Sequence, residues 1–249
     1  MRSSFTWNGI SSESLGLFIE AVPNQNRPER KMDVYNVPGR SGDIVIMQDA
    51  WENVEQRYII WGGMNKGDAT TLGYAVSQWL FGASGYQVLS DTYDTDHYRL
   101  AYFAGGYDFT SHLQRQGRAE ITFSCDPRRF LNSGATSISL PEGVETSLVN
   151  PTIFPAKPLI TVTPNGATQG TVNNVHLETG GLIGWESSSP TGAFVLNSEK
   201  EAATWPSGLS QWSGSTYGNY IILGSGTNKL LPSGGGSTTY SIVPNWWEL

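Results

Sequence analysis

The chain has 249 residues, is rich in glycine (29 residues) and aromatic residues (12 %), and carries few charged residues (15 %) with a net charge of −7. This composition predicts a soluble, mainly β protein with many turns, and it argues against disorder. Neither half carries the excess of positive charge that nucleic-acid binding requires, and no apolar run approaches the ~20 residues that span a bilayer, so we expect no nucleic-acid binding and no membrane insertion.

The first part of the chain, residues 1–131, is predicted to be an α+β domain with one helix. Alternating or apolar runs predict strands in "SLGLFIEAV", "YQVLSD", "HYRLAYFAG" and "GRAEITFSC". The segment "DATTLGYAVSQWLFG" predicts the helix, because its apolar residues recur at helical spacing. A helix inside a series of strands indicates an α+β arrangement.

A single cysteine, Cys125, lies in the last of these strands. One cysteine cannot form an intramolecular disulfide or a zinc site with several cysteines. The alternation places it on the same face as Ala119, Ile121 and Phe123, so we expect a buried core residue.

A domain boundary is expected near residue 131. All ten arginines and all nine aspartates precede residue 130, and the remainder is dominated by Ser, Thr, Gly, Pro and Trp. Residues 132–249 contain many short strand signals, such as "PLITVTP", "GLIGW" and "TTYSIVP", separated by turn residues. This pattern predicts a β sandwich or jelly roll without a helix.

Motifs for catalysis or metal binding are missing from the sequence. The three histidines are far apart, no serine lies in a nucleophile-elbow motif, and no glycine-rich phosphate loop is present. Asp91, Asp94 and Asp96 offer oxygen ligands for calcium, but a polar hairpin tip explains them better. We expect no enzyme, no catalytic or metal-binding residue and no cofactor; a hydrolase that uses Glu186 is the weakest alternative.

Tryptophan is frequent in the second part of the chain. Large aromatic side chains usually fill a core or a subunit contact. Exposed rings also stack on sugars, so a carbohydrate-binding module that recognises host cell-surface glycans is the alternative function. Its candidate residues are Trp185, Trp205 and Trp212.

A long amphipathic hairpin is predicted from Tyr35 to Trp61. Two alternating apolar runs flank the turn "VPGRSG", and nothing in the stretch suits catalysis. A projecting hairpin with two patterned faces can place one face on its own domain and the other on a neighbour. We therefore expect the hairpin to serve assembly, with an ordinary internal hairpin as the alternative.

The N-terminal pattern "FTWNGISSESLGLFIEAV", the hairpin "YNVPGRSGDIVI" and the closing "ITFSCDPRRFL" resemble the distal tail proteins of long-tailed bacteriophages. The resemblance covers residues 1–132, and "VPGRSG" is its most specific part. It implies that the strands Tyr35–Val37 and Asp43–Met47 belong to a ring-forming hairpin. Residues 132–249 are similar to the galectin-like sandwich of these proteins, but they lack the arginine that galectin sugar sites use. The resemblance, together with the alternation of the predicted hairpin through Tyr58 and Ile60, gives the candidate subunit interface: Tyr35, Val37, Pro38, Gly39, Arg40, Gly42, Ile44, Ile46, Tyr58 and Ile60.

The resemblance also implies a function. Such a protein is a structural virion protein that forms a hexameric ring, or two stacked rings, at the distal end of a phage tail. The ring joins the tail tube protein to tail-tip or tail-associated proteins and to receptor-binding or baseplate proteins, and DNA passes through its channel. The protein would be made in the host cytoplasm and located in the virion, at the tail tip.

Overall fold

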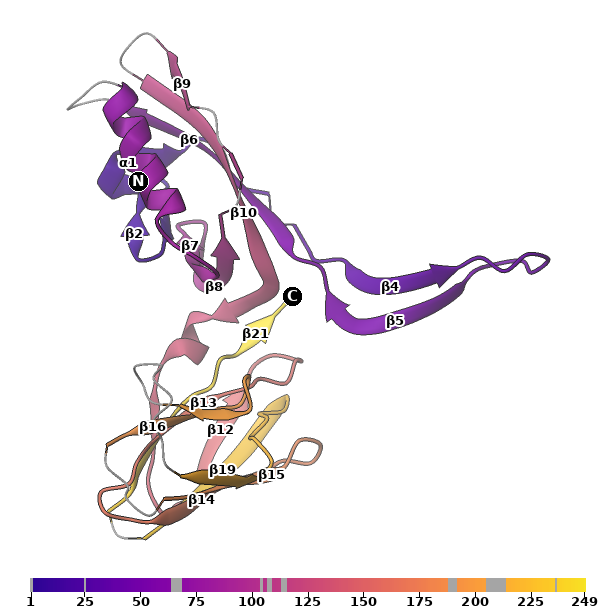
Figure 1. Ribbon diagram of the computed structural model, residues 1–249, viewed down its shortest axis with the longest axis vertical. Coiled ribbons are helices and arrows are strands. Elements are labelled where there is room, and N and C mark those ends of the chain that lie inside the picture. Colours follow the sequence, from indigo (N-terminus) through magenta and orange to yellow (C-terminus); the bar gives the residue numbers. More distant parts are fainter. Residues whose placement is uncertain are drawn as a thin grey trace. The chain divides into compact units, whose positions relative to one another are not determined.

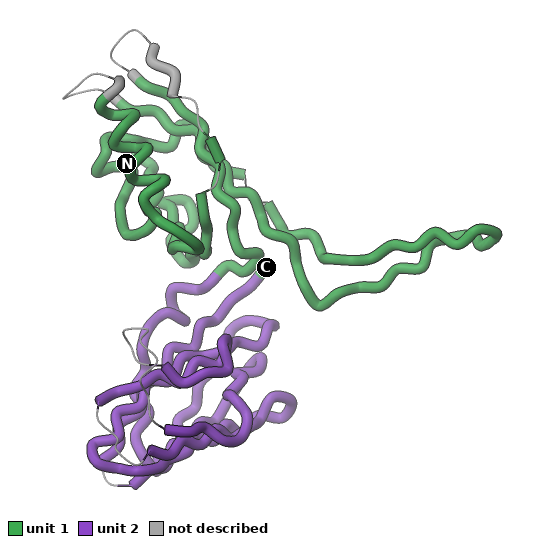
Figure 2. The backbone as a smooth tube through the Cα atoms, viewed as in Figure 1, with its two compact units in different colours: residues 1–129, 249 green, residues 130–248 purple. Residues whose placement is uncertain are grey.

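The computed structural model of the chain describes residues 2–24, 26–63, 69–103, 105–106, 109–112, 116–187, 192–204, 214–235 and 237–249. The chain divides into two compact units, coloured separately in Figure 2. Unit 1 comprises Met1–Arg129 together with Leu249, and unit 2 comprises Phe130–Glu248. The division therefore falls slightly earlier than the boundary expected after residue 131.

Unit 1 contains one twisted sheet, a separate hairpin and, in its described part, one α-helix (Figure 1). The main sheet has the strand order β2-β1-β7-β8-β10-β6-β3, and β9 also pairs with β10. The elements are β1 (Phe5–Trp7), β2 (Ile10–Ser11), the 3-10 helix η1 (Ser12–Leu15), β3 (Leu17–Ile19), β4 (Arg30–Tyr35), β5 (Ile44–Trp51), β6 (Val54–Gly63), α1 (Ala69–Phe81), β7 (Gln87–Asp91), β8 (Asp94–Tyr102), β9 (Phe109–His112) and β10 (Gln116–Leu131).

Helix α1 packs its apolar face on the main sheet. Val76, Trp79 and Leu80 are buried, as their helical spacing predicts. The Trp79 ring stacks on Phe5 with 5.3 Å between ring centroids, and its indole N–H donates to the carbonyl of Trp7 over 3.2 Å. This aromatic layer joins the helix to β1 and forms much of the core of unit 1.

Strand β10 lies between β8 and β6 and buries one face. Cys125 and the alternate residues before it on this face are fully or almost fully buried, which follows from the period of two. In the antiparallel register with β6, Ile121 faces Tyr58 and Ala119 faces Ile60. Tyr58 and Ile60 are therefore core residues, with 2 % and 0 % exposure. Their expected place in a subunit interface is wrong, because the alternation that suggested it comes from the central sheet.

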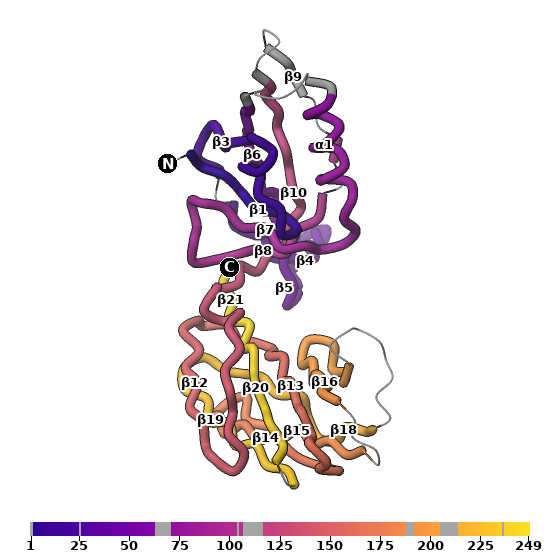
Figure 3. Tube along the Cα trace, turned by 90° about the vertical axis from the view of Figure 1, so that its left-hand side faces the viewer, coloured from indigo at the N-terminus to yellow at the C-terminus, as the bar shows by residue number. Residues whose placement is uncertain are grey.

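Unit 2 is a β sandwich, and its described residues contain no α-helix. One sheet has the order β11-β20-β13-β16-β17 and the other β12-β19-β14-β15-β18. Figure 3 shows the sandwich turned by 90° from the view of Figure 1. The elements are η2 (Asn132–Ala135), β11 (Ile138–Leu140), β12 (Thr146–Asn150), β13 (Leu159–Thr163), β14 (Gln169–Val175), β15 (Gly181–Glu186), β16 (Phe194–Asn197), β17 (Ala202–Thr204), β18 (Ser215–Gly218), β19 (Gly226–Gly234), β20 (Thr239–Val243) and β21 (Trp247–Glu248). The predicted mainly β fold with a sandwich is confirmed.

Side chains from both sheets fill a single core in unit 2. Ile160 and Ile242 come from one sheet, and Val172, Trp185 and Leu230 come from the other; each is at most 1 % exposed. Within the described part of the chain, no helix is both long enough and apolar enough to cross a membrane.

Candidate assembly arm and a polar pocket

Strands β4 and β5 pair with each other and form a two-stranded sheet apart from the main sheet of unit 1 (Figure 1). We call residues 30–51 the arm. The arm differs from the hairpin expected over Tyr35–Trp61. It begins earlier, at Arg30, and ends at Trp51, while the following strand β6 returns to the main sheet.

The tip of the arm is a glycine-containing turn. The N–H of Arg40 donates to the carbonyl of Val37 over 3.1 Å, with Pro38 and Gly39 between them. Gly39 has φ of 84°, so the order Pro-Gly fits a type II turn, which needs a positive φ at its third residue. The side-chain amide of Asn36 donates to Asp43 over 3.2 Å and closes the loop beneath the turn. "VPGRSG" is therefore the tip of the arm.

The pairing register divides the arm into two faces. Directly opposite residues point to the same side of a two-stranded sheet. Tyr35 faces Ile44 and Asp33 faces Ile46, so this side is mixed in polarity. The other side has Val34 opposite Val45 and Met32 opposite Met47, and we call these four residues the apolar face.

Apolar side chains on both faces of the arm are exposed in the isolated chain. Val45 is 47 % and Met47 is 61 % exposed on the apolar face, and Ile46 is 53 % exposed on the mixed face. Among the expected interface residues, Tyr35, Val37, Ile44 and Ile46 are exposed on the arm. The remaining ones in this region, Pro38, Gly39, Arg40 and Gly42, lie at its tip.

Sequence reasoning missed most of the apolar face. Met32 and Val34 precede the predicted hairpin Tyr35–Trp61, and Val45 and Met47 lie in its predicted strand Asp43–Met47 but are not among the expected interface residues. The signal was present, because "KMDVY" alternates apolar and polar residues with period two.

Polar interactions gather toward the base of the arm. Arg30 forms an ion pair with Asp49 over 2.9 Å, and its guanidinium lies 5.7 Å from the ring centre of Trp51. Gln48 donates to Asp33 over 3.0 Å. These exposed pairs contribute little stability. The exposed apolar side chains are therefore the groups through which the arm could bind a partner most strongly.

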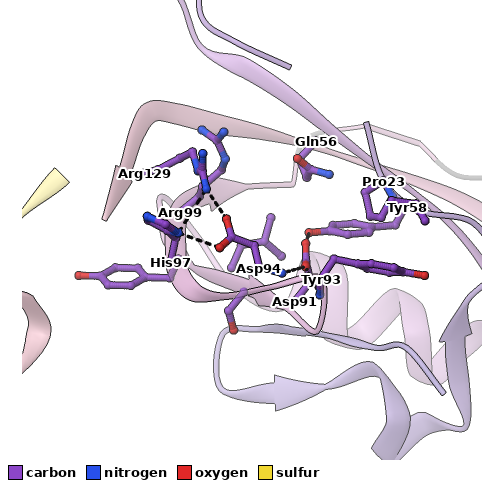
Figure 4. Close-up of a pocket in the computed structure, with 13 residues that line it drawn as sticks. Pro23, Gln56, Tyr58, Asp91, Tyr93, Asp94, His97, Arg99 and Arg129 are labelled. Carbon is purple, nitrogen blue, oxygen red and sulfur yellow. Dashed lines mark hydrogen bonds and ion pairs between the residues drawn. The ribbon is translucent and has the colours of Figure 1, made fainter. Parts of the chain in front are cut away.

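A polar pocket lies in unit 1 beside the turn between β7 and β8 (Figure 4). Arg129, buried on β10, donates to Asp94, and His97 Nδ1 lies 2.7 Å from the same carboxylate. Burial opposes ionisation of Asp94, but the hydrogen bonds from His97 and Arg129 hold its pKa below the ordinary value. The hydroxyl of Tyr58 donates to Asp91 over 2.7 Å. Burial, with Asp91 nearby, raises the pKa of this tyrosine.

The acidic segment considered for calcium is a hairpin tip. Asp91 accepts the backbone N–H groups of Tyr93 and Asp94 over 2.8 and 3.1 Å, and Asp94 is paired with Arg129. These carboxylates therefore already accept hydrogen bonds from other groups of the protein. Within the described ranges, no three His, Cys, Asp or Glu side chains gather as a metal site would require.

Trp185 belongs to the core of the sandwich. Its side chain is fully buried, its indole N–H lies 3.3 Å from the Tyr240 hydroxyl, and its ring meets Phe194 edge-on. The assignment of Trp185 as a sugar-stacking residue is therefore wrong, because a sugar cannot reach it. Trp205 and Trp212 lie outside the described residues.

A sheet domain that carries a projecting hairpin, followed by a β sandwich, defines a two-unit, mainly β fold. No protein-family model matches the sequence, and no curated protein matches it. Among solved structures, the chain is similar to the crystal structure of the Dit protein (gp 19.1) of phage SPP1, described as "a paradigm of hub adsorption apparatus in Gram-positive infecting phages". The TM-score is 0.67 over 100 % of both chains, with 11 % sequence identity. The chain therefore has the Dit fold over its whole length.

Proposed function

We propose that this chain is a structural, non-enzymatic protein of a phage tail. It forms a hexameric ring hub at the distal end of the tail, joins the tail tube to the tip or baseplate and the adsorption apparatus, and leaves a central channel for DNA. One observation carries the proposal: an arm with exposed apolar side chains on both faces extends from a unit with the Dit fold.

The arm has the properties of a contact that forms only on assembly. A two-stranded ribbon alone is marginally stable in water, and packing on a neighbour would stabilise it. The arm of one subunit would pack on a different part of the next subunit, so the contact would be head-to-tail. Head-to-tail contacts form a closed ring when the rotation between successive subunits adds up to a full turn. An obligate interface of this kind buries on the order of 2,000 Å² or more.

The overall charge suits a channel for DNA. The net charge of −7 would repel phosphate groups and would not retain them. A conduit needs this property, because bound DNA would stop moving.

The oligomeric state tests the proposal. Light scattering coupled to size-exclusion chromatography should give six times the 27.1 kDa mass of one chain, or twice that for stacked rings. Negative-stain images should then show rings with a central opening. A monomer at micromolar concentration in low and high salt would contradict the proposal.

A further inference from the structure

His176 fastens the turn between β14 and β15 through both nitrogen atoms of its imidazole ring. Its Nδ1 atom accepts the backbone N–H groups of Glu178 and Thr179, both over 3.2 Å, and the Thr179 hydroxyl lies 3.1 Å from the same atom. Its Nε2 atom lies 3.0 Å from the carbonyl oxygen of Ser225, in the loop before β19. The ring therefore joins the β14–β15 turn to this loop.

These partners determine the protonation state of the ring. A carbonyl oxygen can only accept a hydrogen bond, so Nε2 must carry a proton, and two N–H groups can only donate, so Nδ1 must present its lone pair. The imidazole of His176 is thus held as the neutral Nε2–H tautomer. A protonated imidazole has two N–H groups and no acceptor. It could keep the hydrogen bond to Ser225 but would lose those from Glu178 and Thr179.

A close contact limits the movement of the ring. The backbone of Gly224 packs against it, and a Cβ atom at this position would lie 2.2 Å from Cε1 of His176 and 2.6 Å from its Nδ1. The loop can approach the ring this closely because residue 224 has no side chain. A protonated ring therefore has little room to turn Nδ1 away from the two N–H groups, so the turn itself must move.

Two other turns use the same pattern with oxygen acceptors. Asn197 accepts through Oδ1 the N–H groups of Glu199 and Lys200, two and three residues later, both over 3.0 Å. Asp91 accepts the corresponding two N–H groups in unit 1. Asn and Asp are the usual residues in this position. The amide oxygen of Asn keeps its lone pairs in mild acid, whereas a free imidazole takes up a proton at about pH 6.5.

We infer that the β14–β15 turn is an acid-sensitive element, closed while His176 is neutral and released when its ring takes up a proton. Residues 178–181 line a cleft of about 560 Å³ in unit 2, and this volume is in the range of small-molecule sites. Release of the turn would therefore change one wall of the cleft. The inference concerns unit 2 alone and does not depend on ring formation.

The charged groups around the turn cannot replace the lost hydrogen bonds. Glu178 lies in the turn and is exposed, so its carboxylate would attract the protonated ring but would offer no new acceptor at the position of Nδ1. Lys229 of β19 is paired with Glu145 over 2.9 Å, and the loop that packs on the ring, residues 224–226, has no ionisable side chain. Further charged residues that line the cleft are Lys157 and Glu201.

Hydrogen exchange of the full-length protein tests the inference, with single amides resolved by mass spectrometry. It is measured at about pH 7.5 and about pH 5, on either side of the ordinary imidazole pKa of about 6.5. Protection factors correct for the effect of pH on the chemical exchange rate. In wild type, the protection of the Glu178 and Thr179 amides should fall at least fivefold at the lower pH. The Ala167 amide, which donates to the carbonyl of Pro164 over 2.9 Å in the β13–β14 turn, should keep its protection.

His176→Asn is the matched variant, because its amide oxygen can accept the same two N–H groups, as that of Asn197 does, and does not titrate. It should protect both amides equally at the two pH values, whereas His176→Ala should leave them unprotected at both. Equal wild-type protection at the two pH values would overturn the inference. So would a loss in acid that His176→Asn shares, since the imidazole would then not be its cause. If His176→Ala does not fold, the comparison of wild type with His176→Asn decides alone.

Discussion

At the scale of single residues, burial separates side chains that the sequence places in the same class. Ile46 and Ile60 both lie in alternating runs, but Ile46 is 53 % exposed and Ile60 is fully buried. Trp185 is aromatic like the residues that stack on sugars, yet it fills the sandwich core. Residue type indicates what a side chain could do, and only its neighbours decide whether a ligand or a subunit can reach it.

Cys125 should be chemically inert in the folded protein. Burial raises the pKa of its thiol from the ordinary value to about 12. Because only the thiolate is a nucleophile, the thiol stays protonated and unreactive at about pH 8. We expect no reaction with Ellman's reagent in native buffer and one thiol per chain after unfolding in guanidinium chloride. Rapid labelling of the native protein would contradict the buried position.

Burial of Cys125 was predictable, because one strong period of two runs through β10. The polar pocket beside the β7–β8 turn was not predictable. Most of its members come from β6, β7, β8 and β10, and no spacing in the sequence brings Arg129 to Asp94. The aspartates of the β7–β8 turn are visible in the sequence. The cations that pair with them are brought there by the order of the strands in the sheet, which the sequence does not show.

At the scale of elements, the arm differs from the other strands in having no core of its own. Helix α1 and strand β10 each bury one face on unit 1, so their periodicity and their structure agree. The arm alternates with the same period, but both of its faces are exposed. Periodicity therefore predicted a strand correctly and could not say which face a partner covers.

The apolar face of the arm should matter more for assembly than the mixed face. We expect Val45→Asp to raise the protein concentration needed for assembly at least tenfold, because a carboxylate in an apolar contact costs several kcal/mol and ~1.4 kcal/mol is a factor of ten. Ile46→Asp should have a smaller effect, because Asp33 already lies opposite on that side. Sedimentation velocity over a concentration series measures both.

Val149→Asp is the control for the added charge, since Val149 is an exposed strand residue of unit 2 with 63 % exposure. It should assemble like wild type. Circular dichroism should be near native for all three variants, as the arm makes no part of either core. If Val45→Asp assembles normally, the apolar face is not the contact; if it unfolds, the arm supports its own unit.

At the scale of the whole molecule, two separate cores suggest two folding units. The cores of unit 1 and unit 2 share no residue. The composition change near residue 130 indicated this division, but not its precise position. The N–H of Leu131 donates to the carbonyl of Trp246, and the N–H of Asn245 donates to the carbonyl of Gly134, both over 2.9 Å. Residues 131–134 are thus bonded into unit 2.

A fragment of residues 130–249 should fold alone as a monomer. We expect a cooperative thermal transition by circular dichroism, because the fragment retains the whole sandwich core. A fragment that begins at residue 136 should be less stable, since it loses the backbone hydrogen bonds of Leu131 and Gly134 and the buried side chain of Phe130. Equal melting temperatures for the two fragments would show that this segment is dispensable, and no transition in the longer one would refute independent folding.

The path of β10 has a mechanical consequence. Its N-terminal part forms ten consecutive antiparallel pairs with β6, and its C-terminal end leads directly into unit 2. A pull on the chain at Phe130 that is directed along β10 would load these cross-strand hydrogen bonds together in shear. A pull across the strand would instead break these hydrogen bonds one after another. Because β10 lies between β8 and β6, tension from unit 2 would enter the interior of the sheet and spread to both sides.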